Sequence, residues 1–475
     1  MKQIHRLIKG FFNIPGLPGM LKAFILSLIC CQPSCTKFVE VDPPTTQLVS
    51  QNVFTSDATA VSTVVGTYSK MISSQGFASG WASSVTLLSG LSADELINYS
   101  TDPNTAAFYK NELTPTNSVC GGFLWNECYN LIYTSNAILS GLSGSTGISD
   151  SIRKELEGEV RFLRAFCNFY LVNLFGSIPL INTTDYRKNS IASRTPVPVI
   201  YDSIVSDLQN AQALLPNDYA NSNGERVRPN KWAATAMLAR VYLYLQDWTH
   251  AEEESSAVIG NADLFALLPD LNGVFLKNSQ EAIWQLMPVI PERNTNEGYM
   301  FILTDYPQTA SLSQSLIDSF EVGDNRRNDW VDSVIVSGQT FYYPFKYKIQ
   351  TGSDPEEYSM VLRLAEQYLI RAEARAHLND ITGSISDLNA IRFRAGLTGT
   401  TANDQVGILS AVQHERQIEL NSEWGHRWLD LKRTGQADQV LGHLKGAVWQ
   451  STDTLYPIPK TDITADPNLT QNPGY

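Results

Sequence analysis

Apolar residues recur at helical spacing along most of this chain. The clearest case is residues 152–175, where Leu156, Val160, Leu163 and Cys167 fall on one face. The Gly-Ser-Ile-Pro sequence that follows ends this helix, because glycine and proline both disfavour its continuation. The same periodicity predicts further helices over residues 54–72, 123–142 and 199–215.

Residues 232–259 and 364–397 resemble two copies of one structural unit. In each, an alanine-rich helix reaches a polar turn and a second helix follows. This is the helix–turn–helix pattern of a tetratricopeptide-like repeat. Such units cannot bury their apolar faces alone, so they must stack on neighbouring units. The alanines that would let the helices approach closely are Ala236, Ala239, Ala372 and Ala376.

Two long segments break the helical pattern. Residues 77–117 and 264–354 are rich in Gly, Ser, Asn, Pro and Tyr. The second segment contains strand-like runs at 334–336 and 340–345. We therefore expect long irregular insertions with a few short strands, and such insertions are where binding residues tend to lie.

The N-terminus has the pattern of a targeting segment. No acidic residue precedes Glu40, and residues 23–31 form an apolar stretch too short to span a membrane. Ser34 then precedes Cys35, and a small residue before a cysteine is typical of a lipoprotein cleavage site. We predict a signal peptide over residues 1–34 and lipid attachment at Cys35; an ordinary secretory signal is the alternative. The basic residues of this segment are Lys2, Arg6, Lys9 and Lys22.

Charge and cysteine content narrow the function further. Without residues 1–34, which carry four of the 35 basic residues and no acid, the chain has 31 basic and 48 acidic residues. This balance argues against a nucleic-acid partner, since phosphate binding needs basic patches. The cysteines that remain beyond Cys35 are too few for a disulfide framework, and a bridge between Cys120 and Cys128 is left open.

One segment near the C-terminus resembles a metal site. Glu419, Glu423, His426 and Asp430 stand at i, i+4, i+7 and i+11, which is one face of a continuous helix. The Glu-x-x-His spacing is also that of carboxylate-bridged metal bundles.

Three observations favour ion pairs and packing over metal at this face. Gly425 weakens a helix at its centre, and the chain offers no second Glu-x-x-His helix. Cations are interleaved with the acids, with Arg416 and Arg427 at same-face distances from Glu419 and Glu423. Gly-x-Ser-x-Gly, His-Glu-x-x-His and phosphate-loop motifs are absent from the sequence. Asp94 and Glu95 as a glycosidase couple are a disfavoured alternative. We therefore predict neither an enzyme nor a bound metal.

Several segments together resemble the SusD/RagB family of outer-membrane nutrient-binding lipoproteins. They are SCTKFVEVDPP (34–44), LIDSFEVGDNRRNDW (316–330), LIRAEARAHLND (369–380), DLNAIRFRAG (387–396), ERQIELNSEWGHRWLDLKR (415–433) and LYPIPKTDITADPNLTQNPGY (455–475). The resemblance implies a mainly α fold of about four tetratricopeptide-like units with irregular insertions and a few short strands. It divides the mature chain into an N-terminal region with ligand loops (35–230) and a C-terminal region (231–475).

The same resemblance implies a function. Family members are anchored to the extracellular face of the outer membrane by an acylated cysteine. They capture glycans, or in some branches peptides, and pass them to a SusC-like TonB-dependent transporter; they are not enzymes. We expect an oligosaccharide ligand, with a peptide as the alternative and a metal-dependent enzyme as a disfavoured third. No cofactor is expected, and structural calcium is left open.

Candidate ligand residues follow from the chemistry of sugar recognition. Sugar C–H faces stack on aromatic rings, while polar side chains bind the hydroxyls. Trp81, in a Gly/Ser-rich loop, is the first candidate platform, with a loop-anchoring role as its alternative. For Trp330, burial is the favoured alternative. The loop that carries Asp94, Glu95, Asn98 and Tyr99 is similar in placement to ligand-reading loops of the family. The full set of predicted ligand residues is Trp81, Asp94, Glu95, Asn98, Tyr99, Trp330, Tyr342 and Tyr343.

Overall fold

The computed structural model describes residues 53–73 and 76–475. These residues belong to one compact unit of the chain. The predicted signal peptide (1–34) and lipidated Cys35 lie outside the described residues. The predicted division at residue 230 remains a prediction. Within the described part, no helix is both long and apolar enough to cross a bilayer.

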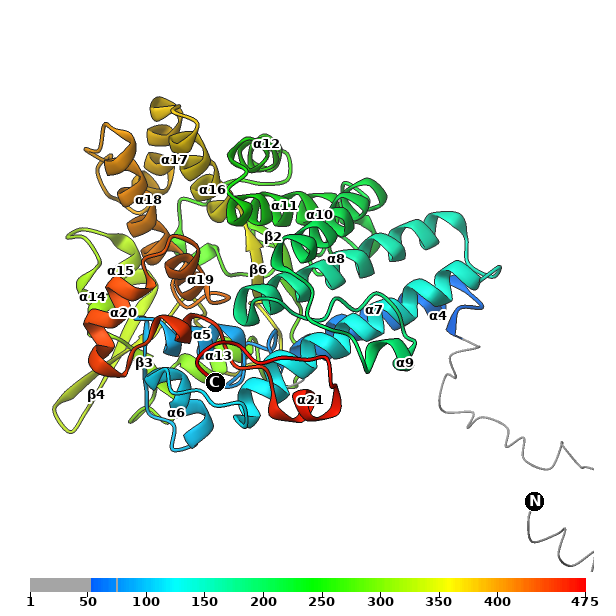
Figure 1. Cartoon of the computed structure of the whole chain (residues 1–475). Coiled ribbons are helices and arrows are strands. Elements are labelled where there is room, and N and C mark those ends of the chain that lie inside the picture. The colour runs from blue at the N-terminus through cyan, green and yellow to red at the C-terminus, as the bar shows by residue number, and fades with distance from the viewer. Residues whose placement is uncertain (1–52, 74–75) are drawn as a thin grey trace, which may run out of the picture. The chain divides into compact units, whose positions relative to one another are not determined.

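A stack of helices forms the scaffold (Figure 1). Each helix packs on the next in chain order, from α7 through α8, α10, α11, α12, α16 and α17 to α18. The predicted repeats correspond to the hairpins α11–α12 and α16–α17. The mainly α, repeat-built fold is therefore confirmed. The bounds are α7 (Glu127–Gly144), α8 (Asp150–Phe175), α10 (Val197–Leu214), α11 (Lys231–Leu245), α12 (Trp248–Ile259), α16 (Leu364–His377), α17 (Ile381–Arg394) and α18 (Gln405–Glu419).

Local sequence explains where these helices begin and how they pack. The side chain of Asn230 caps α11 by accepting hydrogen bonds from the backbone N–H groups of Trp232 and Ala233. Asp247 caps α12 in the same way, and Asp380 caps α17. The predicted alanines of α11 and α16 are fully buried, because small side chains allow the neighbouring backbones to approach.

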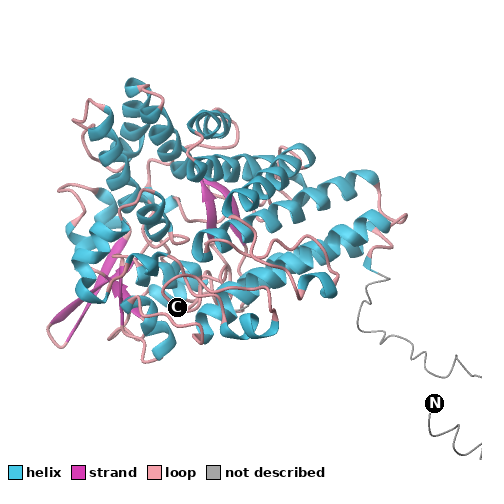
Figure 2. Ribbon diagram, viewed as in Figure 1, coloured by secondary structure: helices cyan, strands magenta, loops and turns pink. Residues whose placement is uncertain are grey.

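Short helices and three small sheets cover this stack (Figure 2). The sheets are antiparallel pairs, β1 with β3, β2 with β6 and β4 with β5. The predicted strand runs at 334–336 and 340–345 correspond to the hairpin β4–β5. The strands are β1 (Leu96–Asn98), β2 (Ala282–Leu286), β3 (Ala310–Leu312), β4 (Val331–Val336), β5 (Gln339–Pro344) and β6 (Ser359–Arg363).

Residues 77–117, predicted to be irregular, contain the helices α5 and α6. Every residue of α5 is buried, so it has no polar face and no amphipathic period for sequence analysis to detect. The remaining helices are α4 (Asp57–Ser73), α5 (Val85–Ser92), α6 (Pro103–Lys110), α9 (Tyr186–Asn189), α13 (Asn296–Phe301), α14 (Gln314–Asp318), α15 (Asn325–Asp329), α19 (His426–Arg433), α20 (Ala437–Lys445) and α21 (Lys460–Ala465), with a π-helix at Cys120–Asn126 and 3₁₀ turns at Ala220–Ser222, Leu271–Gly273, Gly446–Val448 and Ser451–Thr454.

The expectation of one continuous helix through the metal-like face is wrong. Helix α18 ends at Glu419, and α19 begins only at His426. Between them Ser422, Trp424 and Gly425 have positive φ, which a helix does not allow. A Cβ on Gly425 would lie 2.7 Å from the Cβ of Ser89 in α5, so this turn needs glycine for space as well as for conformation.

The three cysteines of the described region are buried free thiols, Cys120, Cys128 and Cys167. No bridge joins Cys120 to Cys128. Burial raises the pKa of the Cys120 thiol, which keeps it protonated and unreactive.

Candidate functional site

A cluster of three aromatic rings forms a solvent-facing platform, which we call the tyrosine platform. The ring centroids of Tyr99 and Tyr306 are 5.5 Å apart with the rings edge to face. The ring of Phe341 lies 5.7 Å from Tyr99 and 5.2 Å from Tyr306, again in edge-to-face contact. Tyr306 is 49% exposed and Tyr99 is half-buried, whereas Phe341 is buried beneath them. The platform therefore offers aromatic surface on a fixed support.

Strand pairing brings these three residues together. In the β1–β3 pair, Asn98 lies opposite Ala310, and the N–H of Tyr99 continues the ladder by donating to the carbonyl of Thr309 at 2.9 Å. Tyr306 precedes β3 by a few residues, so the pairing places it beside Tyr99. Phe341 comes from β5, which packs against β3. The site is thus assembled from three segments that are distant in sequence.

Polar groups surround the tyrosine platform. Neither tyrosine hydroxyl has a hydrogen-bond partner within the described part of the chain, so both are available to a ligand. Asp305 and Gln308 flank Tyr306 and are exposed. Asn98 exchanges hydrogen bonds with the backbone of Ser100 and so shapes the turn beside Tyr99. Aromatic faces next to hydroxyl, amide and carboxylate groups can stack on a sugar ring and bind its hydroxyls.

Asp94 and Glu95 lie next to β1 but do not reach the platform. Asp94 accepts two hydrogen bonds from Arg427, at 2.8 and 2.7 Å, and borders a cavity of about 580 Å³. Glu95 is 1% exposed and accepts a hydrogen bond from the N–H of Ser422 at 3.2 Å. Burial, and next the negative charge of Asp94, raise the pKa of Glu95 to about 8. Asp94 therefore fastens the start of β1 to α19, and Glu95 fastens it to the turn that precedes α19.

Trp81 belongs to a separate aromatic group. Its ring stacks on Tyr299 of α13 at 5.3 Å, and the guanidinium of Arg293 lies over both rings, 4.6 Å from the Trp81 centroid and 3.7 Å from that of Tyr299. Trp81 is half-buried. Its ring thus already has partners within the protein, which agrees with the loop-anchoring alternative.

Two of the other predicted rings, those of Trp330 and Tyr343, are inaccessible. Trp330 is fully buried and donates through Nε1 to the carbonyl of Leu271 at 3.1 Å. Tyr343 is 5% exposed and donates its hydroxyl to Asp332 at 3.1 Å. A ligand cannot reach a buried ring, so Tyr343 as a stacking platform was wrong, whereas for Trp330 the favoured alternative of burial holds. Tyr342 is half-buried with Arg327 over its ring at 4.8 Å.

The metal-like face is a buried ion-pair network. Glu419 binds the guanidinium groups of Arg326, Arg363 and Arg394. Glu423 binds Arg363 at 2.8 Å and the ammonium of Lys346 at 2.5 Å. Each carboxylate is thus neutralised by cations that come from other elements. The predicted ion-pair role holds, whereas Arg416 and Arg427 as the partners of Glu419 and Glu423 were wrong.

The other half of this face has the same character. Asp430 pairs with Arg416 at 2.8 Å and with Arg433 at 2.7 Å. Burial, and next the positive charges of Arg240 and Arg416, hold the pKa of His426 well below its usual range, so its imidazole is neutral. The residues that share a face in sequence therefore serve separate contacts in the fold.

Sequence reasoning missed Tyr306, Tyr299 and Arg293. All three lie in the segment 264–354, which was expected to carry binding residues because it is a long insertion on the helical scaffold. Nothing in the local sequence distinguishes Tyr306 from the other tyrosines, because its partner Tyr99 lies in a different insertion.

Comparison with known proteins agrees with this architecture. Residues 49–243 match the family model described as "Starch-binding associating with outer membrane", and residues 321–475 match the model described as "SusD family". Together the two matches cover most of the chain. The chain belongs to the SusD family.

The alignments with individual relatives cover most of this chain and most of each relative. A SusD-like protein, P25, of Formosa agariphila is 27% identical over 420 residues, which are 74% of this chain and 79% of that protein. The starch-binding protein SusD of Bacteroides thetaiotaomicron is 25% identical over 434 residues, 70% of this chain and 75% of that protein. A solved SusD superfamily protein from Bacteroides vulgatus has a TM-score of 0.77 at 21% identity, covering 89% of this chain and 100% of that chain.

Proposed function

We propose that this protein is a binding protein that captures an oligosaccharide on the tyrosine platform. The observation that carries the proposal is the exposed ring of Tyr306, fixed against Tyr99 and Phe341 and bordered by polar groups. A sugar ring has apolar C–H faces and a hydroxyl rim, and this surface offers the complement of both. The family model's description as starch-binding supports the ligand class. A solved laminarin-binding SusD-like protein of the same fold, with a TM-score of 0.73, also supports it.

We further propose that the captured ligand passes to a SusC-like TonB-dependent transporter. In this proposal Cys35 carries the lipid that holds the protein at the extracellular face of the outer membrane. The family description, which associates these proteins with the outer membrane, supports this location. The protein acts by binding and not by catalysis, and the Arg- and Lys-neutralised carboxylates of the metal-like face agree with that role.

Polysaccharide binding of the full-length protein tests the ligand class. Affinity electrophoresis in gels containing starch or laminarin, compared with calorimetric titration of peptides, measures which class is bound. We expect retardation by a polysaccharide, and we expect Tyr306→Ala to weaken it by at least about tenfold because the stacking surface is lost. Tyr186→Ala is the matched control, since Tyr186 is 76% exposed on α9 and lies outside the platform. Binding to peptides alone would overturn the carbohydrate assignment, and equal loss in both variants would overturn the assignment to the platform.

A further inference from the structure

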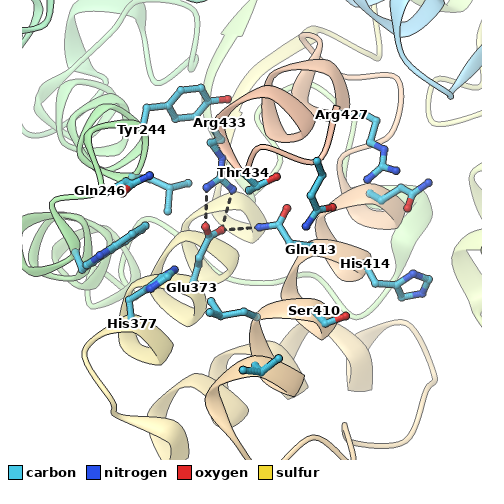
Figure 3. Close-up of a pocket in the computed structure, with 16 residues that line it drawn as sticks. Tyr244, Gln246, Glu373, His377, Ser410, Gln413, His414, Arg427, Arg433 and Thr434 are labelled. Atoms are coloured by element: carbon cyan, nitrogen blue, oxygen red, sulfur yellow. Dashed lines mark hydrogen bonds and ion pairs between the residues drawn. The ribbon is translucent and has the colours of Figure 1, made fainter. Parts of the chain in front are cut away.

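A second cavity lies on the helical-repeat side of the molecule, among α11, α12, α16, α18 and α19. Its volume is about 600 Å³, within the range of roughly 300–1,000 Å³ typical of small-molecule sites. Figure 3 shows side chains from these helices arranged around it, with Glu373 near the centre between Arg433 and Gln413. No residue of the tyrosine platform lines this cavity.

The charged groups of the cavity are already paired. Glu373 accepts hydrogen bonds from Arg433 at 2.6 and 2.8 Å and from the amide of Gln413 at 3.2 Å. Arg427 is held by Asp94. Burial lowers the pKa of His377, so its imidazole is neutral at pH 7. A charged ligand would meet no free counter-charge among these groups, and the cavity therefore favours a neutral ligand.

Neutral hydrogen-bonding groups in the cavity are left without partners. Within the described part of the chain, the side chains of Gln246, Ser410, Gln417 and Gln436 make no hydrogen bond. The hydroxyl of Tyr244, also in the lining, is buried and has no protein partner. A buried polar group without a partner costs roughly 1–3 kcal/mol, which here applies to the Tyr244 hydroxyl alone. Gln417 and Gln436 are half-buried and Gln246 and Ser410 are exposed, so these four side chains are free to exchange water for the donors and acceptors of a ligand.

An aromatic pair completes the lining. The rings of Trp248 and His377 are parallel within 8°, with centroids 3.8 Å apart. They add flat aromatic surface to a wall that also holds the aliphatic side chains Leu243, Val406 and Leu409. Flat rings beside neutral amides match a ligand that has both an apolar face and several hydroxyls.

We propose that this cavity is a second binding site, for a short neutral sugar, separate from the tyrosine platform. The ligand class rests on the proposed carbohydrate-binding function, whereas the position of the site rests on the cavity's own residues. Two sites on one chain would let the protein hold one long glycan at two points. They would also let it hold a long glycan at one site and a short fragment at the other.

Histidine footprinting of the full-length protein localises the binding. Diethyl pyrocarbonate acylates neutral imidazoles, and mass spectrometry of the peptides gives the rate at each histidine. His377 and His414 line the cavity, whereas His443 is exposed outside it and serves as the internal reference. With maltose, cellobiose or laminaribiose as the probe, we expect at least one sugar to slow acylation of both cavity histidines and to leave His443 unchanged.

Two variants separate ligand binding from a general effect. The double variant Gln417→Ala/Gln436→Ala removes two amides that have no partner in the fold, and it is expected to raise the sugar concentration for half-protection about tenfold. Gln339→Ala is the matched control, because Gln339 is exposed in β5 and its side chain makes no hydrogen bond within residues 53–73 and 76–475. This control is expected to behave as the unmodified protein.

The contrary results are equally specific. Absence of protection by all three disaccharides at their solubility limits would overturn the second site, as would protection of His377 by a peptide such as trialanine alone. Tyr306→Ala distinguishes the two proposals, because it is expected to weaken retention by polysaccharide and to leave protection of His377 unchanged. Loss of both signals in Tyr306→Ala would overturn the claim that the sites are separate.

Discussion

Removing one negative charge from the buried ion-pair network is expected to destabilise the protein strongly. Glu419 at the end of α18 is fully buried and contacts three guanidinium groups: Arg363 at 2.6 Å, Arg326 at 2.9 Å and Arg394. Burial alone would raise the pKa of Glu419, but the three arginines outweigh it and hold the pKa well below 4.5. Glu419→Gln keeps the shape of the side chain and removes only its charge.

The size of the effect follows from the burial of all four groups. The substitution leaves three buried cations with less compensating charge, and breaking a buried ion pair in this way costs roughly 3–5 kcal/mol. Unfolding gains an entropy of about 2.1 cal/mol/K per residue. For the compact unit that ends at Tyr475, the total unfolding entropy is therefore about 0.9 kcal/mol/K. The expected decrease in melting temperature is therefore about 3–6 °C.

Thermal unfolding at pH 7, followed by circular dichroism or calorimetry, measures this decrease. The stabilisation by Glu419 is fully present above its unfolded pKa of about 4.5 and is lost as pH falls through the lowered folded pKa, so pH 7 reports the whole effect. Asp185→Asn is the control, because Asp185 pairs with Arg187, which is 75% exposed, and exposed pairs contribute little. If both variants melt at the temperature of the unmodified protein, the network does not stabilise the fold and the argument fails.

Two further predictions concern the join between β1 and α19. Glu95 has a raised pKa of about 8, so the folded state holds an extra proton between pH 4.5 and 8 and stability falls as pH rises through that window. Glu95→Gln is expected to reduce this fall in chemical denaturation at pH 5 and pH 8, and an unchanged pH dependence would contradict the assignment. Gly425→Ala is expected to destabilise the protein more than Gly224→Ala, because both positions have positive φ but only the first would clash, with Ser89. If urea denaturation shows that the two variants lose equal stability, backbone strain alone accounts for the effect and the clash with Ser89 does not contribute.

Local sequence patterns predicted the helical scaffold well. The helix predicted at 152–175 is α8, and the two repeat-like segments are the hairpins α11–α12 and α16–α17. Helical periodicity and capping are decided within a few residues of the chain, so they can be read without knowing the fold. Helix α5 was missed because the prediction relied on periodicity, and a wholly buried helix has no polar face to mark its period.

The candidate site depended on contacts that no local pattern encodes. Sequence alone identified Tyr99 as a candidate, but its partner Tyr306 is defined only by the pairing of β1 with β3. Tyr343 was predicted as a platform, but packing places its ring in the interior, where the ring of Trp330 also lies, as its favoured alternative predicted. Exposure of an aromatic ring is a property of its surroundings, and an insertion without periodicity does not reveal which of its rings are covered.

The segment 415–433 shows most clearly which properties the sequence determines and which depend on the tertiary structure. Its sequence alone established that closely spaced acids and bases would form ion pairs, because unpaired charges are not tolerated where apolar residues are interleaved. Only the tertiary structure decided that the turn at Ser422–Gly425 breaks the helix, and that Glu419 binds Arg326, Arg363 and Arg394 in place of Arg416. Charge interacts through space and not along the chain, so the need for a counter-ion can be read from sequence, whereas its identity follows from the fold.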